Sequence, residues 1–165
     1  GQYPRWKSVK ADFDRYWTCF LEFLAESELT QPKANLWEVV YVNHLEKGRE
    51  WESPKDWSAV VPGLVGDFDR IANGRLDSFS SNTEIELGEQ IGRLRIELNH
   101  GSKQPSPDTE ADRTELLLLQ LIARGPVGEA EAPASSGMDM GRAAIVENFA
   151  SLTGERAHMI WGRTE

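Results

Sequence analysis

Three histidines and a single cysteine are the residues of this 165-residue sequence most suited to chemistry near neutral pH. His44, His100 and His158 lie in no HExxH motif, cysteine pair or EF-hand spacing. Cys19 has no histidine beside it in sequence, which favours a small half-buried residue over a nucleophile. A Walker-type phosphate loop and a nucleophile elbow are also absent from the sequence. The sequence therefore predicts a protein that is not an enzyme, with no metal site and no cofactor.

Polar and aromatic side chains suggest a binding site instead. Asn43 and His44 stand near the end of a largely apolar stretch. A polar pair at such a position is typical of the entrance to a binding pocket. The alternative is that the two residues form the solvent-exposed end of a strand. Aromatic residues nearby can ring such an opening, or they can belong to the core. We predict a ligand-binding site made of six residues: Trp37, Tyr41, Asn43, His44, Trp51 and Trp57. For His158, a buried polar role with a bond to the backbone or to Asn43 is favoured over ligand binding.

Composition narrows the classes of partner and compartment. The net charge is −9 and the isoelectric point is near 4.9, which opposes binding to nucleic acids and to anionic membranes. One cysteine excludes an internal disulfide and fits a reducing cytoplasm. No apolar run approaches the roughly 20 residues that span a bilayer. We expect a soluble, cytoplasmic single domain over residues 1–165.

Two long helical patterns frame the sequence. Apolar residues between Pro4 and Glu28 follow the three-four spacing of one helix face; they are Trp6, Val9, Phe13, Tyr16, Trp17, Phe20 and Leu24. A second helix is predicted from Ser136 or Asp139, and its Gly141 permits close approach to whatever lies beneath. Thr153 is predicted to cap a further short helix.

Between these helices the pattern is that of strands. Residues 35–45 are rich in β-branched and aromatic residues and predict a strand. Both rows of its side chains are largely apolar up to Val42, which predicts cover on both sides for part of its length. Apolar and polar residues alternate in residues 79–87 and 92–100, which predicts an antiparallel pair of strands with one solvent-exposed face. Residues 115–125 read as a buried strand, and residues 99–114 as an exposed loop. Ser53, Pro54 and Asp56 predict a capped short helix that reaches about Val61.

This order predicts an α+β fold. An antiparallel sheet with one apolar face needs cover, and the long N-terminal helix and the C-terminal helix supply it in a two-layer sandwich. With one more strand upstream, the order would be that of the TATA-box-binding-like and helix-grip folds, some of which hold an apolar ligand between helix and sheet.

Several segments resemble a known family. "YPRWKSVKADFDRYWTCFLEFL", "EVVYVNHL", "RLRIELNHG" and "AIVENFASLTGERAHMIWG", in this order, resemble a sporadically distributed family of uncharacterised bacterial and archaeal proteins. The most specific parts are Tyr41 to His44 and the tail from Phe149 to Gly162. Because members of that family are longer at the amino end, the resemblance implies that this chain is a carboxy-terminal domain. It implies no activity.

Two functions of different class follow. The first is a non-catalytic binding domain that holds a small apolar ligand or a peptide between helix and sheet. The alternative is a protein-interaction component of a bacterial defence, toxin-antitoxin or immunity system, in which an acidic chain pairs with a protein partner. The sequence leaves the oligomeric state open.

Overall fold

The structure is a computed structural model of the chain. It describes residues 5–66, 76–88, 91–103, 113–127 and 133–162. The chain divides into two compact units, Gly1–Ala34 and Asn35–Glu165. The expectation that residues 1–165 form a single domain stays a prediction, and each unit is described by itself.

The first unit is built on one long helix. Helix α1, Trp6–Glu26, confirms the helix predicted between Pro4 and Glu28. It ends where Glu28 adopts a positive φ of 54° and the Leu29 N–H donates to the Leu24 carbonyl at 2.8 Å, as in helices that close with a left-handed residue. The Gln31 side-chain amide then donates to the Leu21 carbonyl at 3.4 Å. The segment after α1 therefore lies beside the last turns of the helix.

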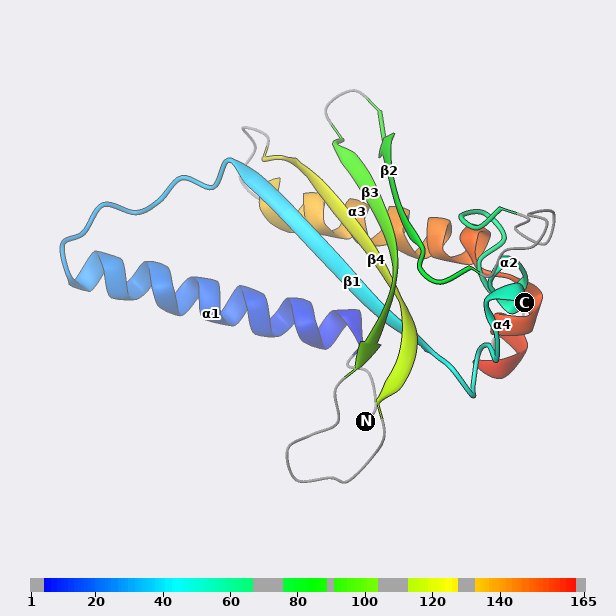
Figure 1. Cartoon of the computed structure of the whole chain (residues 1–165). Helices are drawn as coiled ribbons and strands as arrows, with labels where there is room; N and C mark the ends of the chain where they lie inside the picture. Colours follow the sequence, from blue (N-terminus) through cyan, green and yellow to red (C-terminus); the bar gives the residue numbers. More distant parts are fainter. Residues whose placement is uncertain (1–4, 67–75, 89–90, 104–112, 128–132, 163–165) are drawn as a thin grey trace. The chain divides into compact units, whose positions relative to one another are not determined.

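The second unit is built on a four-stranded antiparallel sheet with strand order β1-β4-β3-β2 (Figure 1). The strands are β1 (Leu36–Glu46), β2 (Ser80–Glu86), β3 (Arg93–Lys103) and β4 (Thr114–Pro126). All four predicted strands are confirmed, including the leucine-rich β4, which pairs with both β1 and β3. In the register, Leu121 of β4 lies opposite Tyr41 of β1 and Ile96 of β3.

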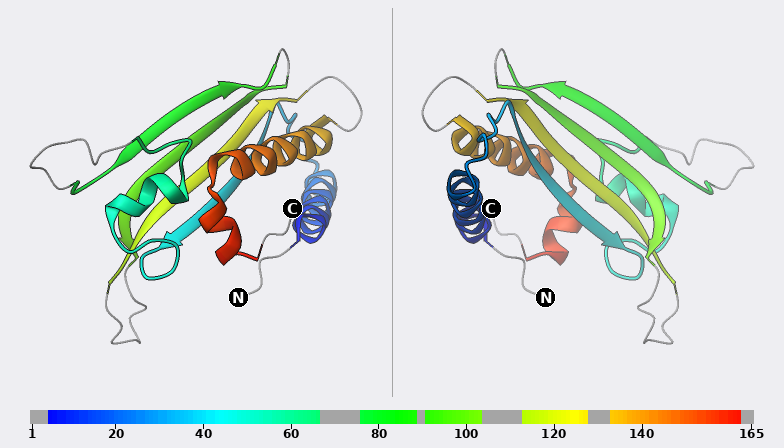
Figure 2. Two further views of the ribbon diagram at one scale, coloured as in Figure 1. Left: turned by 90° about the vertical axis from the view of Figure 1, so that its right-hand side faces the viewer. Right: turned by 90° about the vertical axis from the view of Figure 1, so that its left-hand side faces the viewer.

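One face of the sheet is the core of this unit. It carries Leu94, Ile96 and Leu98 from β3, Leu117, Leu119, Leu121 and Ala123 from β4, and Trp37, Val39 and Leu45 from β1, all of them buried. Helix α3, Pro133–Leu152, runs across this face and contacts β1, β4 and β3 (Figure 2). An α+β arrangement, with helix and sheet in two layers, is therefore confirmed.

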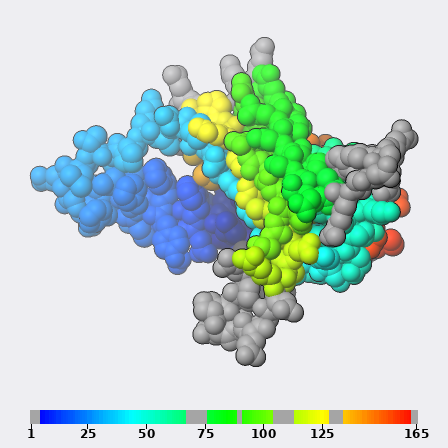
Figure 3. Space-filling model, in the orientation of Figure 1, coloured from blue at the N-terminus to red at the C-terminus, as the bar shows by residue number. Residues whose placement is uncertain are grey.

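The other face of the sheet carries several exposed side chains among the described residues of this unit. The space-filling view shows it toward the reader (Figure 3). Leu36 and Val40 of β1 are 42% and 46% exposed on it, so at these positions the described residues of this unit do not supply the cover on both sides that the sequence predicts for part of β1. Over β2 and β3 this face is charged, as predicted, and Arg93 pairs with Glu84 across the two strands at 2.6 Å. An antiparallel sheet tolerates such a half-solvated arrangement because the helices need to cover only one face.

Short helices close one end of the sheet. They are the 3-10 helix η1 (Pro54–Asp56), helix α2 (Trp57–Val60) and helix α4 (Glu155–Ile160). The capping box predicted at Ser53 and Asp56 is present. The Gly154 N–H donates to the Val60 carbonyl at 2.9 Å, which joins the start of α4 to α2. A Cβ at Gly154 would lie 2.1 Å from the Ala59 carbonyl oxygen, so this approach requires glycine.

Three boundaries predicted from the sequence are wrong. Helix α3 begins at Pro133 rather than at Ser136 or Asp139, since a proline in the first turn loses no intrahelical hydrogen bond. Strand β3 continues to Lys103, where a polar loop was expected, because β4 supplies partners for these residues as far as Thr114. The N-cap of α4 is Gly154 and not Thr153. The Thr153 hydroxyl donates instead to the carbonyl four residues before it.

Candidate functional site

Trp51 and Trp57, two of the predicted ligand-binding residues, lie in the core next to one another. They are 1% and 0% exposed, and their rings meet edge to face at 5.4 Å. The Trp51 indole N–H donates to the Leu45 carbonyl at 2.8 Å, and the His100 ring lies 4.9 Å from the Trp57 ring. In this arrangement both tryptophans hold the α2 region against the end of the sheet.

Trp37 is also enclosed, but at a different place. It is 2% exposed and lies beneath α3. A Cβ at Gly137 or Gly141 of α3 would approach its ring to 2.3 or 2.4 Å, and one at Gly125 of β4 to 2.6 Å. The close approach predicted for Gly141 is therefore present. Three glycines make the room that this indole occupies between helix and sheet.

The remaining predicted site residues divide between the two faces of β1. Tyr41 and Asn43 share the core-facing row with Trp37 and are half-buried, and the Asn43 side-chain amide donates to the Leu119 carbonyl at 3.3 Å. His44 is exposed on the opposite row. The structure thus brings Trp51 and Trp57 together but separates His44 from Asn43. Ligand binding by the six residues stays a prediction.

His158 forms a polar pair with Thr153. Its Nε2 lies 2.7 Å from the Thr153 hydroxyl oxygen, and that hydroxyl lies 2.6 Å from the Phe149 carbonyl. Because a carbonyl only accepts, the hydroxyl proton belongs to that bond and His158 Nε2–H donates to the oxygen. The proton geometry is thus the reverse of a nucleophile activated by a base. The structure therefore shows a hydrogen bond from His158 to Thr153, and not the bond to Asn43 predicted from the sequence as one alternative.

A buried carboxylate that sequence reasoning missed lies beside the C-terminal helix. Glu50 is 1% exposed. It accepts hydrogen bonds from the Glu46 backbone N–H at 2.7 Å and from the Trp161 indole at 3.0 Å, and Arg49 lies 3.3 Å from it. Nothing in the polar run around Glu50 indicates burial, since its indole donor lies 111 residues further along the chain. Its partners give it a structural role.

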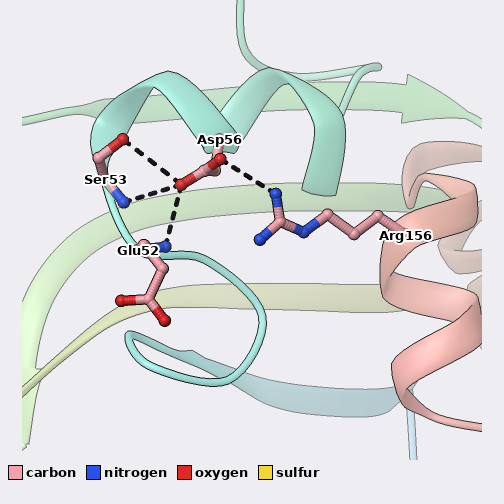
Figure 4. Close-up of polar contacts among 4 residues, drawn as sticks. All are labelled: Glu52, Ser53, Asp56 and Arg156. Atoms are coloured by element: carbon pink, nitrogen blue, oxygen red, sulfur yellow. Dashed lines mark hydrogen bonds and ion pairs between the residues drawn. The ribbon is translucent and has the colours of Figure 1, made fainter.

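Asp56 links the same two regions by a second contact (Figure 4). Its Oδ2 accepts from the Ser53 and Glu52 backbone N–H groups at 2.9 and 3.0 Å. Its Oδ1 accepts from the Arg156 guanidinium of α4 at 3.0 Å. The Ser53 and Glu52 N–H groups, followed by the Arg156 charge, lower the pKa of Asp56 below its ordinary value. The carboxylate is held ionised, as a cap and an ion-pair partner.

An ion pair lies at the Glu115 end of β4. Lys47 donates to Glu115 at 2.7 Å, and this bond lowers the pKa of Glu115, with a further contribution from His100. His100 Nε2 lies 3.6 Å from the other carboxylate oxygen, beyond hydrogen-bond reach. Glu115 is 45% exposed, so its ion pair with Lys47 is a surface contact near the buried Trp51 and Trp57.

Neither a metal-binding group of side chains nor a membrane-spanning helix is found among the described residues. Among the residues described, no three histidine, cysteine or acidic side chains gather as a metal site would require. No helix in those same ranges has the length and apolar character needed to cross a bilayer.

Helix α1 carries the largest group of exposed apolar side chains on one described element. Val9, Phe13, Tyr16, Phe20 and Phe23 are 43%, 40%, 65%, 43% and 59% exposed. We call these five residues the α1 stripe. Sequence reasoning found four of the five within the helix face and missed Phe23. Cys19 is exposed on the same helix rather than half-buried.

Comparison of the chain with models of protein families, with curated proteins and with solved structures finds no match. The resemblance to the sporadically distributed prokaryotic family therefore stays a prediction.

Proposed function

We propose that the chain is a non-catalytic protein-interaction module and that α1 supplies its docking face. The partner that this face fits is an apolar helix of another polypeptide. The observation that carries the proposal is that the described residues of α1's own unit leave all five side chains of the α1 stripe exposed. Of the two functions predicted from the sequence, this is the protein-interaction alternative.

The composition of the α1 stripe supports a protein partner. Four of its five members are aromatic, and large aromatic side chains dominate the energetics of protein interfaces. A contiguous apolar surface of this kind is typical of a binding site, because exposing it to water has no benefit for the folded chain. Among the described residues of this unit, 5–34, the only other part is the short segment that follows α1, which lies beside its last turns.

The chemistry of the described clusters points the same way. The Thr153 hydroxyl proton is committed to a carbonyl, and the Glu50 carboxylate is committed to two N–H donors. Trp37, Trp51 and Trp57 are occupied in packing, so they are poorly placed to grip a ligand. The apolar-ligand function accordingly receives less support than protein binding.

Site-specific photo-crosslinking tests the proposal. A photoreactive phenylalanine analogue replaces Tyr16 in the α1 stripe, and in a matched variant it replaces Ala11, which is exposed on the other side of the helix. We expect a discrete crosslink to a polypeptide from position 16, its loss when Phe20→Glu is added, and none from position 11. Equal crosslinking from the two positions, or none from position 16, would contradict the proposal.

A further inference from the structure

The charges of α1 run against its helix dipole. Arg5, Lys7 and Lys10 lie at its start, where the first turn has no acidic residue, and Glu22 and Glu26 lie at its end, where the last turn has no basic residue. A helix is stabilised by the opposite arrangement, by about 0.3–1 kcal/mol per charge. The observed order therefore weakens the isolated helix, and an explanation has to come from outside it.

The spacing of the α1 stripe is that of a helix-pairing seam. Its five members follow one another at intervals of four, three, four and three residues, which is the a/d pattern of the heptad repeat. In this frame Val9, Tyr16 and Phe23 are d positions and Phe13 and Phe20 are a positions. Positions that flank the seam on the d side then include Arg5 at the start of the helix and Glu26 at its end.

We propose that α1 binds α1 of a second copy of this chain in antiparallel orientation, which rests on the proposed function and names its partner. A twofold axis that passes between Asp14 and Arg15 places Val9 opposite Phe20 of the second copy and Phe13 opposite Tyr16 of the second copy. Every stripe residue in these layers meets an apolar residue. The contact is isologous, so each pair occurs twice.

The same axis explains the inverted charges. In antiparallel pairs the flanking positions of the same type face each other, so Arg5 lies beside Glu26 of the second copy at both ends. A parallel, in-register pair would place Arg5 beside Lys10 of the second copy, and like charges there oppose assembly. The charge order that disfavours the single helix thus favours the antiparallel pair and selects its direction.

Sedimentation velocity of the full chain is the first test. We expect the wild-type chain to be a dimer at micromolar concentrations and Phe13→Glu to be a monomer. Ala11→Glu adds the same charge on the outer side of the helix and should remain a dimer. A dimer that survives Phe13→Glu would overturn the proposal, because it would have to form elsewhere.

A charge exchange separates pairing from a merely structural effect. Arg5→Glu and Glu26→Arg each place a favourable charge at an end of the helix dipole. If the two charges acted only within the single helix, each variant would leave the dimer dissociation constant unchanged or lower it. We expect each to raise the dimer dissociation constant about tenfold, because two attractive pairs become repulsive, and the double variant to restore it. Failure of the double variant to recover affinity would overturn the antiparallel arrangement.

A distance measurement checks the direction independently. A spin label at Ala25→Cys, in a Cys19→Ser background, should lie about 30 Å along the helix axes from its equivalent in an antiparallel dimer, at 1.5 Å per residue. In a parallel dimer the two labels would be level, which would overturn the proposal.

Failure of this inference and failure of the proposed function are distinguishable. If the wild-type chain is monomeric at several hundred micromolar, the second copy is not the partner. A crosslink from position 16 to a different polypeptide would then leave the interaction function standing. A monomer with no crosslink from position 16 would remove both.

Discussion

The contact between α3 and the sheet can be tested by giving Gly141 a single methyl group. On helix propensity alone, Gly141→Ala in the middle of α3 should stabilise the protein by about 1 kcal/mol. Its new Cβ, however, would lie 2.4 Å from Cζ3 of Trp37 and 3.0 Å from Cη2. The ring has little room to retreat, because it is enclosed between α3 and the sheet: a Cβ built at Gly125 of β4 would also lie only 2.6 Å from it.

The balance of the two effects sets the expected magnitude. Overpacking a tight core by one methyl group costs about 1–3 kcal/mol, and the distances place this site near the upper figure. After subtracting the propensity gain, we expect a net loss of about 2 kcal/mol, which lowers the melting temperature by roughly 4–8 °C for a chain of this size. Urea unfolding followed by far-ultraviolet circular dichroism measures the free energy without relying on tryptophan emission.

A double-mutant cycle assigns the cause. Trp37→Phe removes the part of the ring that the new methyl group meets, so Gly141→Ala in that background should become neutral or stabilising. Ala143→Gly, at an exposed position of the same helix, should cost about 1 kcal/mol from propensity alone. If Gly141→Ala raised the stability of the otherwise wild-type chain by about 1 kcal/mol, the packing of α3 on Trp37 would be refuted.

Three further changes probe the polar contacts that fasten α4. Glu50→Ala should cost about 1–3 kcal/mol in urea unfolding, because it leaves the part-buried Glu46 backbone N–H and Trp161 indole without their acceptor; a loss below about 0.5 kcal/mol, as at an ordinary surface site, would contradict this. Thr153→Val should cost about 1–2 kcal/mol through loss of its two hydrogen bonds, and an unchanged free energy of unfolding would show that they contribute nothing. Asp56 has a lowered pKa, so the stability it contributes is fully present above its ordinary value of 3.8 and is lost as pH falls through the lower folded value. The difference between wild type and Asp56→Asn should therefore shrink in acid, and a pH-independent difference would contradict the assignment.

Much of the fold follows from local sequence patterns. The leucine run of β4 reads correctly as a strand because its length and the Gly125-Pro126 stop outweigh its helical propensity. The capping box at Asp56 is read from residues that are neighbours in the sequence. The close packing of α3 on Trp37 is read from the small size of Gly141. The cap is predictable because its cause lies within a few residues of its effect, and the approach at Gly141 is predictable because a residue without a Cβ permits close contact whatever its partner.

What the sequence conceals depends on distant partners. Burial of Glu50 is set by Trp161, and extension of β3 to Lys103 is set by β4, so neither has a local signal. The apolar outer row of β1 predicts a cover that the described residues of the second unit do not supply at Leu36 and Val40. Hydrophobicity shows that a side chain favours burial but does not identify what would bury it. Phe23 was missed because the helix face was traced through Leu24, one residue along.

Hydrogen exchange of α1 at two protein concentrations tests the docking face most directly. Most of the stability of a helix in a protein comes from the packing of its apolar face, so an α1 that pairs with a second copy should gain protection as concentration rises, while β4 stays unchanged. We expect Trp6–Glu26 to be protected at high concentration, to exchange rapidly after dilution below the dissociation constant, and to exchange rapidly at both concentrations in Phe13→Glu. Protection of α1 that is the same at every concentration would contradict the account.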